Sequence, residues 1–140
     1  MKKRTIISVF LGLTFSITAF ATEEDRALTP TQKANVVMNS CNKPGRDESR
    51  QCLVQQSNQT LSEFIDLYMQ KKEELKSAQL SYTEKQAGLD AISSVYNLKF
   101  SASTNCKPDP MSAFEGSTAI SYCQILNNFE AIEKLDQIQF

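Results

Sequence analysis

Residues 46–80 read RDESRQCLVQQSNQTLSEFIDLYMQKKEELKSAQL, and this stretch decides the fold. It contains neither Gly nor Pro, so nothing in it forces a helix to stop. Its apolar residues recur at three-, four- and seven-residue steps, at Val54, Leu61, Phe64, Ile65, Tyr68 and Leu75. This spacing predicts an amphipathic helix of about 30 residues that begins near Asp47 or Glu48. The mixed charges at 71–76 predict a solvated face near its C-terminal end.

A second helix is predicted before this stretch. Thr29 can cap it, Pro30 suits the first helical position, and Gln32 completes a capping box. We expect the helix to run to about Cys41, because the Pro-Gly pair at 44–45 ends it.

Two more helices are predicted after the long one. The sequence Thr83-Glu84-Lys85-Gln86 has the form of a capping box and opens a helix that reaches about Phe100. The last helix is expected to begin near Ser117 and to extend towards Phe140. Between them, 101–116 is small, polar and rich in proline, and is therefore the predicted functional loop. No stretch shows the alternation of a strand. The predicted fold class is all-α, with about four helices in a small disulfide-stapled bundle.

The N-terminus has the pattern of a cleavable secretory signal peptide. A positive start, Lys2-Lys3-Arg4, precedes an apolar run from Ile6 to Phe20, and Ala19-Phe20-Ala21 supplies the small-x-small cleavage pattern. The apolar run is shorter than the roughly 20 residues that a membrane-spanning helix needs. We therefore expect residues 1–21 to be removed, leaving one helical four-cysteine domain over 22–140 without a membrane span, in the periplasm or the medium.

Composition narrows the classes of function. The predicted mature part keeps 12 of the 15 basic residues and all 16 acids, a net charge of −4. No basic stripe remains, so we expect no nucleic-acid partner. The chain has no His, which removes the commonest general base and the commonest metal ligand. We accordingly expect no catalytic residues, no metal and no cofactor.

Two carboxylate spacings and one serine are the catalytic alternatives that the sequence offers. Glu63/Asp66 and Glu130/Glu133 are each spaced for one helical face, which is ordinary surface composition rather than a glycosidase pair. Ser117 follows a glycine in a loop, but a serine nucleophile needs a base, and its simpler role is to cap the last helix. An enzyme is therefore the least favoured function.

The four cysteines lie in the mature part, at Cys41, Cys52, Cys106 and Cys123. They allow three connectivities, between which the sequence alone does not decide. An exported chain favours disulfides over free thiols, and the spacing favours two local pairs, Cys41–Cys52 and Cys106–Cys123. Each pair would staple a helix–loop–helix corner.

The cysteine frame resembles that of the LprI-like lysozyme inhibitors, which are small exported helical domains with two cysteine pairs. Cys41, ten intervening residues and the segment Cys52-Leu-Val-Gln55-Gln56 follow the outline of that family's first half, and Tyr68 stands where its tyrosine falls. The second half follows with Cys106, Gly116-Ser117, Cys123 and Leu135. The resemblance implies the same two local pairs and an inhibitor of lysozyme.

The chain departs from that family's pattern at several positions. Leu61 and Phe64-Ile65 stand in place of its Asp and Leu-Asn before the tyrosine, and Phe129 replaces an Arg of the last helix. The Trp and the Tyr-Arg-Asp before the third cysteine are replaced by the segment from Leu98 to Asn105. The frame is shared, whereas the residues that would contact a partner differ.

The leading hypothesis is therefore a non-enzymatic binding or inhibitor protein of the bacterial envelope. The disulfide-held loop 107–117 would present Asp109, Glu115 and Ser117 to a basic protein such as a lysozyme, because a stapled loop loses little entropy on binding. The alternative is a periplasmic immunity protein that neutralises a secreted toxin, which would have the same size, charge and cysteines.

Overall fold

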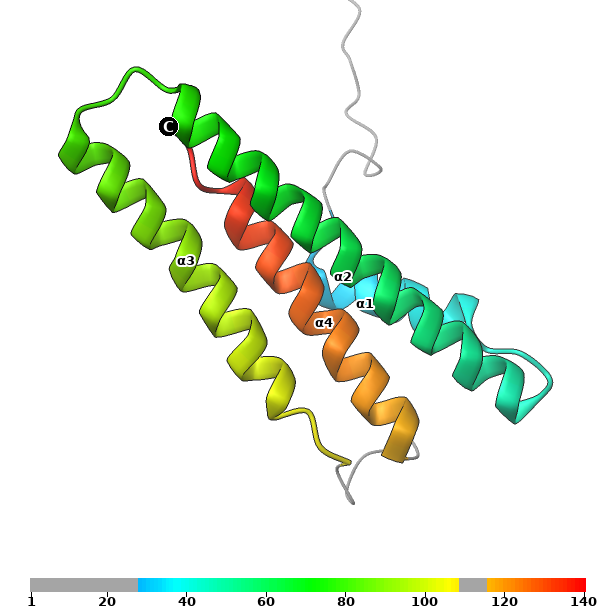
Figure 1. The fold of residues 1–140 in the computed structure, drawn as a ribbon. Helices are drawn as coiled ribbons and strands as arrows, with labels where there is room; N and C mark the ends of the chain where they lie inside the picture. The colour runs from blue at the N-terminus through cyan, green and yellow to red at the C-terminus, as the bar shows by residue number, and fades with distance from the viewer. Residues whose placement is uncertain (1–27, 109–115) are drawn as a thin grey trace, which may run out of the picture.

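The computed structural model describes residues 28–108 and 116–140. These residues form four α-helices and no strand: α1 (Pro30–Ser40), α2 (Arg46–Ser77), α3 (Tyr82–Thr104) and α4 (Gly116–Asp136) (Figure 1). The predicted all-α class and its four helices are confirmed. The predicted signal peptide lies outside the described residues.

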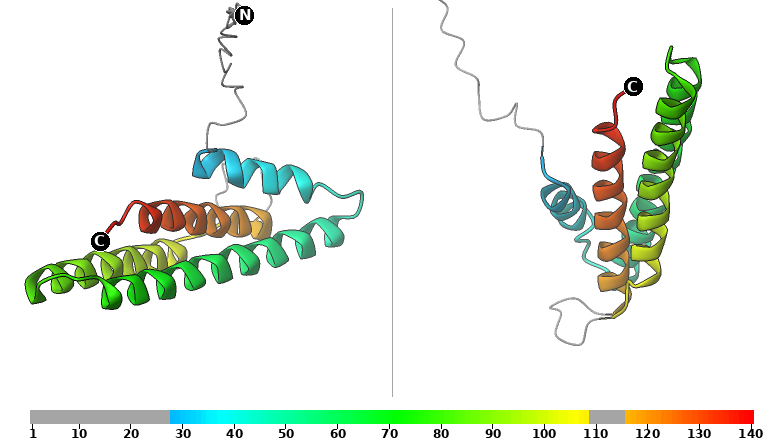
Figure 2. Two further views of the ribbon diagram at one scale, coloured as in Figure 1. Left: turned by 90° about the horizontal axis from the view of Figure 1, so that it is seen from above. Right: turned by 90° about the vertical axis from the view of Figure 1, so that its left-hand side faces the viewer.

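The helices form three layers and alternate in direction along the chain (Figures 1 and 2). The helices α2 and α3 lie side by side in one outer layer, α4 forms the middle layer, and α1 covers the opposite face of α4. The α2–α4 interface is the most extensive of the contacts between helices. None of the four helices is both long and apolar enough to cross a membrane.

The sequence locates one helix start correctly and misplaces another. In α1, Thr29 Oγ1 accepts from the Gln32 backbone N–H, and Gln32 Oε1 accepts from that of Thr29, as predicted. The helix α3 begins at Tyr82, not at Thr83-Glu84, because Ser81 and Glu84 form the capping box. Glu84 is a charged acceptor at the third helical position, so it outcompetes Gln86 as the partner of a cap.

The helix α2 runs for 32 residues, close to the predicted length, and packs the predicted stripe against the core with one exception. Phe64 and Leu75 are buried, but Val54 is 48% exposed and its neighbour Leu53 is buried instead. The difference arises because α3 lies alongside only the C-terminal part of α2 (Figure 1). Beyond the end of α3, the side of α2 that is buried is the side that faces α1 and α4. Leu53 lies on this side and packs against residues of those two helices.

The core consists of two apolar clusters with polar residues between them. One cluster contains Phe64, Leu75, Ile92, Ala131 and Leu135, and the other contains Ala34, Cys41, Leu53 and Ile125. Between them Asn128, which is 2% exposed, donates to Ser57 O at 3.2 Å and to Thr60 Oγ1 at 2.9 Å. These hydrogen bonds join α4 to α2 at the middle of the bundle.

The C-terminal tail packs against the end where α2 meets α3. Lys71 donates to Ile138 O at 2.9 Å, and its side chain is only 12% exposed. The predicted solvated face at 71–76 is thus wrong for Lys71, because the tail covers it. On α3, a Cβ at Gly88 would lie 2.7 Å from Leu75 Cδ1 and 2.8 Å from Phe140 Cε1, so glycine permits this close approach.

Candidate functional site at the braced end

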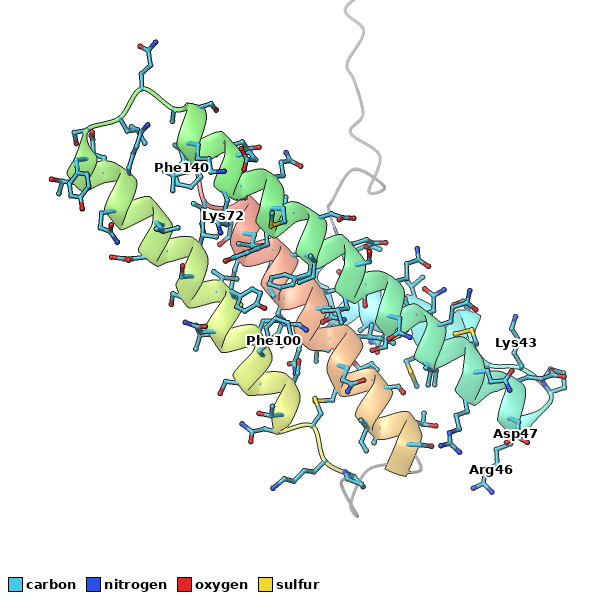
Figure 3. The ribbon with its side chains drawn as sticks, in the orientation of Figure 1. Lys43, Arg46, Asp47, Lys72, Phe100 and Phe140 are labelled. Atoms are coloured by element: carbon cyan, nitrogen blue, oxygen red, sulfur yellow. A yellow bond between two sulfur atoms is a disulfide. The ribbon has the colours of Figure 1, made fainter. Side chains whose placement is uncertain are left out.

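Both disulfides have the expected pairing and lie towards the same end of the bundle (Figure 3). Cys41–Cys52 joins the end of α1 to α2, and Cys106–Cys123 joins the end of α3 to α4, with Cα–Cα distances of 5.4 and 5.7 Å. We call this half of the molecule the braced end: residues 38–58, 103–108 and 116–123.

The corner between α1 and α2 is held by more than its disulfide. Cys41 is buried, and the hydroxyl of Ser49 accepts from Lys43 N at 2.9 Å and donates to Lys43 O at 3.2 Å. At the other disulfide, Asn127 Nδ2 lies 3.3 Å from Cys106 Sγ. Because the bridges and these hydrogen bonds restrict the chain, the surface at this end is preorganised.

A groove of about 520 Å³ runs along the exposed face of α2 at the braced end. We call it the α2 groove, and the described residues that line it are Asp47, Arg50, Gln51, Val54, Gln55 and Asn58. Val54 is an apolar centre surrounded by polar and charged side chains.

A second hollow of about 580 Å³ lies among α1, the start of α2 and the start of α4. Its lining is polar but uncharged at most positions, with Asn35, Asn39, Asn42, Ser49 and Thr118 beside Met38, Cys41 and Leu53. Amide and hydroxyl groups here offer both donors and acceptors to a partner's backbone.

The predicted contact residues are placed only in part. Ser117 is exposed, but it lies within the first turn of α4, one residue after the helix begins, so it does not cap the helix from outside. Asp109 and Glu115 lie outside the described residues, and so does most of the predicted loop. Sequence reasoning missed the α2 groove, because Val54 continues the apolar spacing of the stripe that was predicted to face the core.

The charges of the described braced end are mixed rather than acidic. Its described residues include four bases and two acids: Lys43, Arg46, Arg50 and Lys107, and Asp47 and Glu48. Three of them, Lys43, Arg46 and Asp47, lie at the outermost part of the braced end (Figure 3).

The acids of the two candidate catalytic pairs do not come together in one cleft, since among the described residues only Glu130 of the four lines a hollow. Glu63, Asp66, Glu130 and Glu133 are all exposed. Two carboxyls with a lowered pKa, Glu84 and Glu74, owe it first to hydrogen bonds from Ser81 and Gln70, and both lie towards the opposite end. Within the described residues, no group of three His, Cys, Asp or Glu side chains could hold a metal ion.

Comparisons with known proteins give no match to this chain among family models, curated proteins or solved structures.

Proposed function

We propose that the chain is an exported, non-enzymatic protein of the bacterial envelope that binds and inhibits a partner enzyme through its braced end. The observation that carries this proposal is that both disulfides fix helix corners at the end that bears the α2 groove. A surface held in this way loses little conformational entropy when a partner docks. The disulfides also support export, since such bonds persist in oxidising compartments such as the periplasm.

We further propose that the partner is a lysozyme. The resemblance to the LprI-like inhibitors supports this choice, and Gln55, one of the residues of the shared outline, lines the α2 groove. In this proposal the partner contacts the α2 groove and also the loop residues Asp109, Glu115 and Ser117. Val54 would be its apolar anchor.

The test is an inhibition assay with the oxidised, purified protein against a panel of lysozymes. Val54→Asp places a charge in the groove, and Met69→Asp is the matched control, because Met69 is also on α2, is 51% exposed and lies outside the braced end. We expect wild type and Met69→Asp to inhibit equally. Val54→Asp should be weaker by about tenfold or more, since a buried valine contributes roughly 1.5–3 kcal/mol.

Two results would contradict the proposal. One is the absence of inhibition of every lysozyme at roughly tenfold molar excess of the protein. The other is equal inhibition by Val54→Asp and wild type, which would show that the partner does not contact the α2 groove.

A further inference from the structure

The opposite end of the molecule carries a basic cleft that the proposed function does not use. It lies between the last turns of α2 and the first turns of α3, has a volume of about 400 Å³, and is lined by Lys72, Leu75, Lys76, Tyr82, Lys85, Gln86 and Leu89. We call it the tip cleft. Val54 and Lys72 are 18 positions apart on α2, or about 27 Å along its axis, so the tip cleft and the α2 groove are separate surfaces (Figure 3).

The tip cleft combines an apolar floor with a rim of ammonium groups. Leu75 is buried, whereas Leu89 is 38% exposed and Tyr82 even more so, which leaves apolar surface open to a ligand. A pocket of this volume, lined by apolar side chains with a few charged groups, is typical of a small-molecule site.

The rim has more positive charge than its neighbours neutralise. Lys76 pairs with Glu73 at 2.5 Å. Lys85 donates to the uncharged carbonyl of Lys76 at 3.1 Å. Lys72 Nζ lies 5.4 Å from the centroid of the Tyr68 ring, and neither Lys72 nor Lys85 has a carboxylate partner among the described residues. Two ammonium groups are thus available to an anion.

Three aromatic side chains form a row along the seam between α2 and α3, next to the tip cleft in sequence. Beyond Lys72, the Tyr68 ring lies 4.8 Å from Tyr96, and Tyr96 lies 4.6 Å from Phe100, measured between ring centroids. All three aromatic side chains are only partly buried. A linear apolar chain that enters the tip cleft could therefore follow this aromatic row.

We propose that the tip cleft binds a single-chain anionic amphiphile, a fatty-acid-like molecule with a carboxylate head and an unbranched tail. Lys72 and Lys85 bind the carboxylate. Leu75 and Leu89 contact the tail, which continues towards Tyr68. This site is independent of the proposed inhibition, because it lies on the other half of the molecule.

Isothermal titration with dodecanoate below its micelle concentration tests the site, using the full exported protein. We expect saturable binding by wild type and by Lys43→Glu, the matched charge reversal at the braced end. Lys72→Glu/Lys85→Glu should bind about tenfold more weakly or worse. Methyl NMR signals of Leu75 and Leu89 should shift on binding, and a circular dichroism spectrum would confirm that each variant is folded.

Two further probes separate head from tail. Acetate has the head alone, and dodecyltrimethylammonium has the tail with the opposite charge; neither should bind as dodecanoate does. The proposal is overturned if dodecanoate does not bind, if either probe binds as tightly, or if the double charge reversal leaves the affinity unchanged.

Discussion

Lys99 is a buried residue whose ammonium group lies over two aromatic rings. The residue is 6% exposed, and Nζ lies 4.1 Å from the centroid of Phe100 and 5.6 Å from that of Phe64. Among the described residues no carboxylate pairs with it. Cation–π attraction contributes about 0.5–2 kcal/mol, whereas removing an ammonium from water costs several kcal/mol. Desolvation therefore dominates and lowers the pKa of Lys99.

Replacing this charge should stabilise the protein. We expect Lys99→Met, which keeps the length and the apolar stem of the side chain, to raise the free energy of unfolding at pH 7 by about 1 kcal/mol. Urea denaturation measures the change. A loss of stability of similar size would show that the aromatic rings more than compensate for desolvation.

The same lysine predicts a pH dependence. Its pKa is lower in the folded state than the ordinary 10.5, so the folded protein releases this proton first. The cost of burying the charge is fully present below the folded pKa and is relieved as pH rises towards 10.5. We therefore expect the free energy of unfolding of Lys99→Met to exceed that of wild type by less and less as the pH rises through this range. Urea titrations of both proteins at each pH measure this difference. A difference that stays constant with pH would contradict the lowered pKa of Lys99.

At the scale of helices, Asn128 holds α4 against α2. Truncation to Ala removes its hydrogen bonds to Ser57 O and Thr60 Oγ1 and leaves a cavity. We expect Asn128→Ala to lower the free energy of unfolding by about 2 kcal/mol, from two lost bonds of roughly 1 kcal/mol each. The exposed Asn97→Ala on α3 is the control and should change stability by less than about 0.5 kcal/mol. If both substitutions changed stability equally, the hydrogen bonds of Asn128 would not hold α4 against α2.

The helices were predictable from sequence to the extent that local rules govern them. The capping box at Thr29 and the uninterrupted stretch 46–80 fix the α1 start and the length of α2. The register of α2 near Val54 was not predictable, because it depends on where α3 ends beside it. The burial of Asn128 and Lys99 was not predictable either. It follows from helix packing, and polar side chains do not contribute to an apolar periodicity.

At the scale of the molecule, the two disulfides constrain the braced end. Removing Cys106–Cys123 by double substitution to Ala releases a loop with a sequence separation of 17 residues. We expect a loss of about 3 kcal/mol in the free energy of unfolding, on the chain-entropy estimate. A melting curve unchanged from that of wild type would show that helix packing alone holds α3 to α4.

The candidate site was predictable in outline only. The cysteine spacing indicated two stapled corners, and both pairs are present. The gathering of both bridges at one end depends on the antiparallel order of the helices, which no local pattern encodes. The α2 groove depends on α3 being shorter than α2, and the tip cleft on residues from two helices that meet only in the folded chain.

The central claim is that the braced end is the surface that a partner enzyme contacts. Hydrogen–deuterium exchange of the purified protein, alone and with saturating lysozyme, locates that surface directly. We predict added protection in residues 41–58 and 107–118 and unchanged exchange in residues 72–89. Protection confined to residues 72–89, or none in either segment of the braced end, would contradict the claim.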